Sequence, residues 1–251
     1  MSVTATPGLL YDAALALFYP QSCAVCDASV ESRFDGIACA ACWKETCIFT
    51  PSDTLCWKCG IPAFTNIAEG RREQVRCRRC DDDAFDAARA CGLYEGALRV
   101  SVIGLKRQPH VAPRLARMLR EAYERTPLNC ASLIVPVPLH PERQRQRGFN
   151  QAAVLAKEIS KFARLSVDDT SLIRTVHTQL HRAGMDAQMR RESVENAFAL
   201  RTSRRVAGVR ILLVDDVFTT GATLSACAAV LQEAGAEAVL VLTVARLQEA
   251  F

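Results

Sequence analysis

The sequence of 251 residues predicts an α/β protein built on a parallel sheet, preceded by a small cysteine-rich region. Two observations carry this prediction. From about residue 84 onward, short apolar runs alternate with helical patterns, which is typical of a parallel sheet covered on both faces. Before that point, the cysteines fall into four closely spaced pairs, which is unusual for a chain that otherwise has an ordinary composition.

Composition and charge exclude few functions. Half of the residues are hydrophobic, 23% are charged and the formal net charge is +4, which is compatible with nucleic acid or phosphorylated ligands. No apolar run is long enough to span a bilayer. The apolar stretch at residues 9–19 lacks a basic n-region and contains Asp12, so we expect residues 1–20 to hold a short helix and not a signal peptide. The expected location is cytoplasmic.

The cysteine pairs have the spacing of zinc ribbons. The first two pairs form C-x2-C-x12-C-x2-C and the next two form C-x2-C-x17-C-x2-C. Each C-x2-C turn presents two thiolates to one cation, and two such turns complete a tetrahedral shell. Because disulfides are rare in the cytoplasm, metal ligation is the better interpretation. The predicted ligands of two structural zinc ions are Cys23, Cys26, Cys39, Cys42, Cys56, Cys59, Cys77 and Cys80.

Two questions stay open for this region, which we expect to cover residues 21–83. An iron–sulfur cluster or redox disulfides are the alternatives to zinc, although the spacing differs from that of ferredoxins. Sequential pairing of the turns is simplest, but crossed pairing is possible, and Cys47 lies between turns as a spare thiol. A segment of about 60 residues with so few large apolar side chains would hardly fold without metal.

The elements of the α/β region follow from apolar periodicity and from helix start and stop signals. Asn150 is expected to cap the helix that follows it, and Gly235 to end the last helix. The expected strands cover residues 88–94, 132–137, 172–176, 209–214 and 238–244, and the expected helices cover residues 96–105, 111–125, 150–164 and 224–234.

A pair of acids stands at the end of the apolar run of residues 211–214. Asp215 and Asp216 can accept hydrogen bonds from ribose hydroxyls or lie near Mg²⁺. The Thr/Gly segment after them leads into a helix, whose first N–H groups can hold a phosphate. An ordinary α/β turn is the alternative. The predicted phosphate-binding residues of this segment are Thr219, Thr220, Gly221, Ala222 and Thr223.

Basic residues elsewhere are candidates for the rest of a phosphate site. Arg143 and Arg147 follow the strand of residues 132–137 and would make bidentate contacts to phosphate oxygens, unless this loop is simply a solvated basic surface. Lys106 ends the helix of residues 96–105. Arg190 and Arg191 lie in residues 177–198, a segment long enough to cover the site.

Residues 211–223 resemble the PRPP-binding motif of type I phosphoribosyltransferases, with Phe218 at a place where an aliphatic residue is commoner. Together with the cysteine pairs and the R-G-F-N-Q segment of residues 147–151, they make the chain resemble the ComF family. That resemblance implies a double zinc ribbon followed by a phosphoribosyltransferase domain over residues 84–251. The chain departs from the family pattern at Ser193, Gln179 and Arg182, within the segment predicted to cover the site.

By resemblance, the chain binds PRPP with Mg²⁺, has Asp215 and Asp216 as catalytic residues and serves DNA uptake during natural transformation. One hypothesis is a transferase that displaces pyrophosphate from ribose; no acceptor is indicated. The other is a non-catalytic, nucleotide-sensing adaptor for single-stranded DNA and a helicase partner. Its DNA contacts would include a basic cluster beside the last cysteine pair, formed by Arg71, Arg72, Arg76, Arg78 and Arg79.

Overall fold

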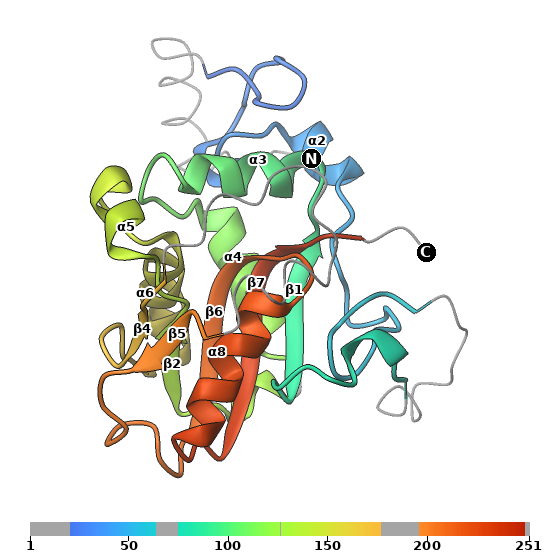
Figure 1. Cartoon of the computed structure of the whole chain (residues 1–251). Coiled ribbons are helices and arrows are strands. Elements are labelled where there is room, and N and C mark those ends of the chain that lie inside the picture. Colours follow the sequence, from blue (N-terminus) through green and yellow to red (C-terminus); the bar gives the residue numbers. More distant parts are fainter. Residues whose placement is uncertain (1–20, 64–74, 126, 177–195, 249–251) are drawn as a thin grey trace.

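The computed structural model describes residues 21–63, 75–125, 127–176 and 196–248 (Figure 1). The helix expected within residues 1–20 lies outside these ranges. So does the predicted cover at residues 177–195, with Arg190 and Arg191, and so do Arg71 and Arg72. In the part that is described, no helix is both long enough and apolar enough to cross a membrane.

A five-stranded parallel sheet forms the centre of the molecule, as predicted. Its order is β1–β7–β6–β2–β3. The two longest strands, β6 and β7, lie side by side in the middle, because their apolar side chains alternate between two covered faces. The strands are β1 (Ala87–Leu93), β2 (Leu133–Pro136), β3 (Ser166–Val167), β6 (Arg210–Phe218) and β7 (Ala238–Arg246).

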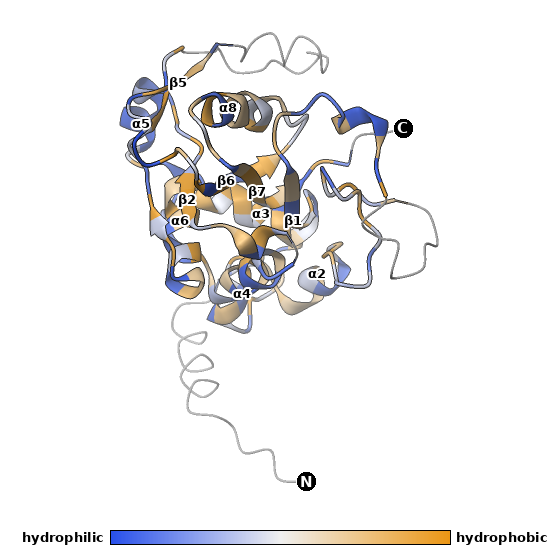
Figure 2. Cartoon of the chain, turned by 90° about the horizontal axis from the view of Figure 1, so that it is seen from below, coloured by the Kyte–Doolittle hydropathy of each residue, from blue (hydrophilic) through white to orange (hydrophobic). Residues whose placement is uncertain are grey.

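Helices cover both faces of this sheet (Figure 2). One face carries α3 (Gly96–Leu105), α4 (Pro113–Tyr123) and α6 (Gln151–Ala163), and the other carries α8 (Ala222–Glu233). Asn150 caps α6 as expected, since its side chain accepts a hydrogen bond of 3.0 Å from the N–H of Ala152. These helices agree with the expected ones to within about two residues at each end.

Two local expectations were wrong, and a third element, correctly expected as a strand, lies outside the main sheet. The strand predicted to end at residue 214 continues to Phe218, because its backbone stays paired with β7 as far as Arg246. The basic loop contains a short helix, α5 (Pro141–Arg147), which starts at a proline and ends at Gly148 in the left-handed conformation. The strand near residue 172, β4 (Leu172–Arg174), pairs with β5 (Phe198–Leu200) in a separate antiparallel sheet.

The two cysteine regions pack on opposite faces of the sheet. The first contains α2 (Ala40–Glu45) and shares a hydrophobic core with α3, α4 and α6. The second shares a core with α8, β6 and Phe85. Short 3-10 turns complete these regions and the loop before β2, at Arg33–Asp35, Arg78–Cys80 and Leu128–Cys130.

The segment between the two cysteine regions runs along the outer edge of β1. Ile48 forms an antiparallel bridge with Gly92, and the N–H of Phe49 donates to the carbonyl of Cys91 at 2.8 Å. The N–H of Leu93 donates to the carbonyl of Cys47 at 2.9 Å. Every residue of β1 is consequently buried, although β1 is the last strand of the parallel sheet.

Candidate functional site

The eight predicted cysteine ligands form two separate clusters. Within each cluster the Sγ atoms all lie within 4.8 Å of one another, and neighbouring Sγ atoms are 3.4–3.8 Å apart. Zn–S bonds of about 2.3 Å at tetrahedral angles require roughly this spacing. The donor set therefore fits two structural zinc ions. Sequential pairing is confirmed, with Cys23, Cys26, Cys39 and Cys42 in one cluster and Cys56, Cys59, Cys77 and Cys80 in the other.

Backbone N–H groups point at the sulfurs, as expected of zinc-binding turns. Cys23 Sγ accepts hydrogen bonds from the N–H groups of Val25 and Cys39 at 3.4 and 3.3 Å. Burial of the Cys23 thiol raises its pKa, but these backbone donors outweigh burial and bring the pKa to about 6. The thiolate form of Cys23 is therefore favoured before the ion binds. Cys47 is exposed and lies outside both clusters, as the sequence indicated.

Strand β6 extends beyond the end of its neighbour β2, and Asp215 and Asp216 lie in this extension. The pairing of β2 with β6 stops at Pro136 opposite Val214, whereas β7 accompanies β6 to its end. The acids therefore stand at the carboxyl edge of the sheet, where open α/β sheets bind their ligands. The Asp216 carboxylate is 2.9 Å from the ammonium of Lys106, which caps the end of α3. The structure thus brings together two of the elements predicted to hold one ligand.

The two carboxylates destabilise one another in the ligand-free protein. Burial raises the pKa of Asp215 well above its ordinary value, and the charge of Asp216 raises it further. The N–H of Asp216 donates to Asp215 Oδ1 at 2.8 Å, and Lys106 lies nearby, but these contacts compensate only in part. A site of this kind favours a cation or a set of hydroxyl donors over an empty pocket.

Replacing Asp215 with asparagine is expected to raise the melting temperature of the ligand-free protein by a few degrees at neutral pH. A raised folded-state pKa means that this carboxyl contributes most to stability below its unfolded pKa, near 4, and that the contribution is lost as the pH rises through the folded value. The advantage of asparagine should therefore shrink as the pH falls toward 4. Melting curves of both proteins from pH 4 to 8 would measure it, and a pH-independent difference would contradict the assignment.

The Thr/Gly turn connects these acids to α8. Gly221 has φ 81° and is the N-cap of that helix. Thr220 Oγ1 accepts a hydrogen bond of 3.4 Å from the N–H of Ala222, and Thr219 is exposed. A Cβ atom at Gly221 would lie 2.9 Å from the Phe218 ring, so glycine is required by both conformation and space. The turn and the first residues of α8 therefore stand at the same sheet edge as the acids.

The two predicted arginines of α5, Arg143 and Arg147, have different neighbours. Burial lowers the pKa of Arg174, and the charge of Arg143, on α5, lowers it further. The charge of Asp215 opposes this shift. Arg174, at the end of β4, is therefore a candidate site residue that sequence reasoning missed. Its guanidinium carbon stands 5.2 Å from the centre of the Phe198 ring. Arg147 donates a hydrogen bond to the side chain of Gln151 at the start of α6.

Comparison with known proteins agrees with this architecture. The family model of the double zinc ribbon domain matches residues 14–81. Competence protein F of Haemophilus influenzae is 30% identical over 238 residues, which cover 91% of this chain and 98% of that protein. DNA utilization protein YhgH of Escherichia coli K12 is 30% identical over 233 residues, covering 90% of this chain and 96% of that protein.

Among solved structures, a similar one is the glutamine PRPP amidotransferase from Bacillus subtilis complexed with ADP and GMP. It is 18% identical with a TM-score of 0.35, and the match covers 59% of this chain and 26% of that one. The relatives that match almost end to end, the two four-cysteine clusters and the parallel sheet lead to one conclusion. This chain belongs to the ComF family, and in it a double zinc ribbon is joined to an α/β core built on a parallel sheet.

Proposed function

We propose that the protein binds PRPP, or a related phosphoribosyl ligand, together with Mg²⁺ at the carboxyl edge of β6. The observation that carries this proposal is the acid pair of half-buried Asp215 and buried Asp216, joined to Lys106, directly ahead of a Thr/Gly turn that starts a helix. The carboxylates would hold ribose hydroxyls and hydrated Mg²⁺. The N–H groups at the start of α8 would bind the 5′-phosphate.

If the protein is an active transferase, a nucleophile forms a bond to C1 of the ribose while the bond from C1 to the pyrophosphate oxygen breaks. Bound Mg²⁺ would supply charge neutralisation for the departing pyrophosphate. The residues of this chain would contribute position and charge, because the transition state resembles an oxocarbenium ion. Lys106 pairs with Asp216, and the charges of both Arg143 and Asp215 act on Arg174, so we assign pyrophosphate binding to Lys106, Arg143 and Arg174, with Arg147 as a further contributor.

The binding proposal is tested by isothermal titration calorimetry of the zinc-loaded protein with PRPP and Mg²⁺. Replacing Asp216 with asparagine is expected to weaken binding at least about tenfold, because a charge-assisted contact contributes about 1.5–3 kcal/mol. The matched control is Asp169→Asn, an exposed acid outside the site. Absence of heat with the wild-type protein would end the proposal, as would equal affinity of the Asp216 variant.

The cellular role we propose is DNA uptake in the cytoplasm. The names of the two relatives, competence protein and DNA utilization protein, support this role. A reducing compartment also suits the two clusters, because their eight thiolates must stay unoxidised to hold zinc.

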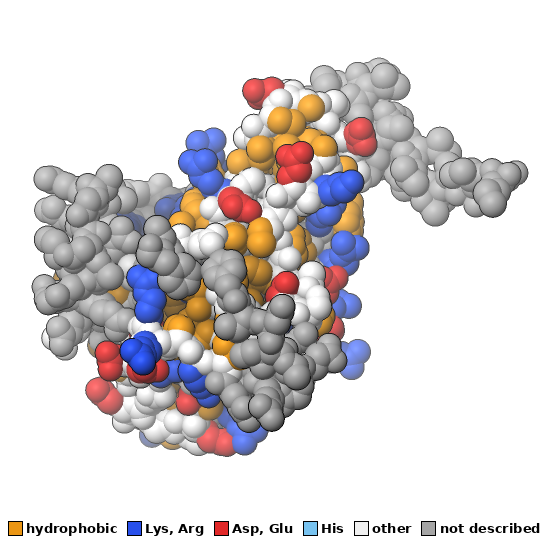
Figure 3. Space-filling model, turned by 90° about the vertical axis from the view of Figure 1, so that its right-hand side faces the viewer, with side chains coloured by type: hydrophobic (Ala, Val, Ile, Leu, Met, Phe, Trp, Pro, Cys, Tyr) orange, Lys and Arg blue, Asp and Glu red, His pale blue; other side chains and the backbone are white. Residues whose placement is uncertain are grey.

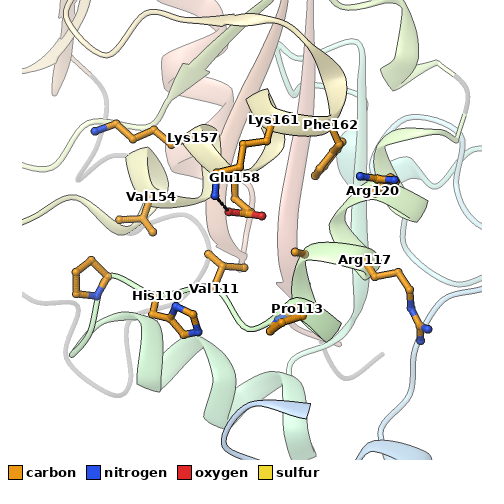
Figure 4. A pocket seen from close by; sticks show the side chains of 12 residues that line it. His110, Val111, Pro113, Arg117, Arg120, Val154, Lys157, Glu158, Lys161 and Phe162 are labelled. Carbon is orange, nitrogen blue, oxygen red and sulfur yellow. Dashed lines mark hydrogen bonds and ion pairs between the residues drawn. The ribbon is translucent and has the colours of Figure 1, made fainter. Parts of the chain in front are cut away.

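A basic groove between α4 and α6 favours single-stranded DNA as a second ligand (Figure 4). It has a volume of about 890 Å³ and an apolar floor that includes Val111, Val154 and Phe162. Four cationic side chains line it against one acid, Glu158, which is 2.5 Å from the ammonium of Lys161. These cations, spaced one helical turn apart on each helix, are Arg117, Arg120, Lys157 and Lys161.

The groove is near in sequence to the lysine that pairs with Asp216. His110 lines the groove and follows Lys106 by four residues, so their Cα atoms are at most roughly 14 Å apart. A strand with its terminal phosphoribosyl group at the acids could therefore continue into the groove. The second ribbon is a weaker candidate for this contact. On the side of the molecule where it lies, Lys and Arg are interspersed with Asp and Glu on the described surface (Figure 3).

Replacing both Arg120 and Lys157 with alanine is expected to weaken binding of a fluorescent oligothymidine and to lower the slope of log affinity against log salt by about 1.4. Fluorescence anisotropy at several salt concentrations measures both quantities. The matched control replaces two ribbon arginines, Arg76 and Arg78. If only the ribbon variant lost affinity, the contact would lie on the ribbon and not in the groove.

A further inference from the structure

We infer that the second zinc ribbon positions the phosphate-binding turn, and that Arg246 is the positioning residue that joins them. The inference rests on the proposed function, since it concerns the same site. It adds a coupling between occupancy of the second zinc site and affinity for the phosphoribosyl ligand. Sequence reasoning gave the ribbons a structural role and, in one hypothesis, a DNA contact, and it assigned Arg246 no role.

Arg246 bridges the second ribbon and β6. It ends β7 and is 5% exposed. Its guanidinium donates a hydrogen bond to the carbonyl oxygen of Cys59, one of the ligands of the second cluster. The same guanidinium carbon lies 4.5 Å from the centre of the Phe218 ring, within the range of a cation–π contact. One buried side chain thus contacts both a zinc-ligand residue and the residue that precedes the turn.

Phe218 transmits this contact to the turn. Its ring meets Phe85 edge-on at 5.8 Å, and its carbonyl accepts a hydrogen bond of 2.8 Å from the N–H of Leu247. The turn folds back over the ring so tightly that a Cβ atom at Gly221 would lie 2.9 Å from it. The aromatic residue at this unusual position in the motif now has a physical reason. An aliphatic side chain would offer Arg246 no π face.

The residue that directly follows the ribbon is also bonded to α8, and the ribbon itself borders the turn. The N–H of Ala84 donates to Ser225 Oγ at 2.9 Å, and the side chain of Gln232 donates to the carbonyl of Ala84 at 2.7 Å. Between the cluster and the turn only about 30 Å³ remains, lined by three of the ligating cysteines together with Thr219 and Thr220. Because the turn packs this closely against the ribbon, unfolding of the ribbon would remove the contacts that hold the turn in its conformation.

The first ribbon provides a matched comparison. There Arg114 binds Asp35 at 2.6 Å and lies 5.0 Å from the centre of the Trp43 ring. It makes the same kind of bridge on the opposite face of the sheet, but it belongs to α4 and none of these partners belongs to the turn. Only the second ribbon should therefore couple to ligand binding. Because coupling between two binding events is reciprocal, the ligand should also slow loss of zinc from the second site.

The test compares Arg246→Lys with Arg114→Lys, both of which keep the charge and lose the planar guanidinium. Three quantities are measured: PRPP affinity by calorimetry, the rate of zinc release to a chromogenic chelator with and without PRPP, and hydrogen exchange of a peptide that covers residues 219–223. For Arg246→Lys we expect about tenfold weaker PRPP binding, zinc release that PRPP no longer slows, and faster exchange in the turn. Arg114→Lys should behave like the wild type in all three.

Wild-type affinity and wild-type exchange in Arg246→Lys would overturn the inference. If wild-type protein gave no heat with PRPP, the proposed function would fail, and the exchange rates would still decide whether the ribbon orders the turn. Phe218→Leu is the second variant, in case Arg246→Lys does not fold. It keeps an apolar side chain in the core and removes the π face, so the same loosening of the turn is expected.

Discussion

Replacing Cys42 with serine is expected to remove one of two zinc ions per chain and to lower the melting temperature by more than about 10 °C. Cys42 is a buried ligand of the first cluster and also part of the hydrophobic core beneath α3 and α4. A zinc ribbon has little apolar interior of its own, so the free energy of metal binding is largely its free energy of folding. Loss of the ion would release Trp43, which is only 2% exposed, from that same core.

The measurement is zinc content by mass spectrometry of the metal, together with a thermal melt. Cys47→Ser is the control, because Cys47 is close in the chain, exposed and not a ligand. It should keep two zinc ions and the wild-type melting temperature. Retention of two ions by the Cys42 variant would refute the ligand assignment, and an unchanged melt would show that the first ribbon does not support the core.

Replacing Gly92 with alanine is expected to destabilise the fold by about 3 kcal/mol, which corresponds to about 6–12 °C in melting temperature. A Cβ atom there would lie 2.2 Å from the carbonyl oxygen of Cys47 and 2.8 Å from Leu98 Cδ1. The oxygen belongs to the segment that is paired along β1, so it cannot move without breaking that pairing. The backbone of Gly92 is not left-handed, and the whole effect is therefore steric.

Gly104→Ala separates this effect from the general consequence of losing a glycine. Its Cβ would approach Ile37 Cδ1, the end of a flexible side chain, at 2.8 Å, and alanine improves helix propensity by about 1 kcal/mol. This variant should melt close to the wild type. Equal stability of the two variants in a denaturant titration would mean that the segment beside β1 is loosely held.

Local pattern was sufficient to predict most of the α/β region and the metal ligands. These features depend only on neighbours in sequence, so a single sequence contains the information. Examples are the apolar run of residues 211–214, the cap at Asn150 and the C-x2-C spacing. The extension of β6 to Phe218 was missed because pairing with β7, and not local composition, decides where that strand ends.

The missed side chains have a similar explanation. Arg174 ends a short strand whose partner, β5, lies more than 20 residues further along the chain, so nothing near it in sequence marks it as a neighbour of Arg143. Arg246 follows a long apolar strand and looks like an ordinary polar terminus. Its buried contacts with Cys59 and Phe218 join parts of the chain far apart in sequence. An aromatic residue at a usually aliphatic place was the only sequence signal of that contact.

The segment that passes along β1 has a consequence for how the chain avoids sticking to other chains. A mostly apolar outermost strand with free N–H and C=O groups is a template for intermolecular β-pairing. Here the connection between the two ribbons pairs with β1 around Gly92 and so covers part of that template. The metal-binding region thus protects this strand edge from intermolecular pairing. The α/β region produced without it is expected to self-associate.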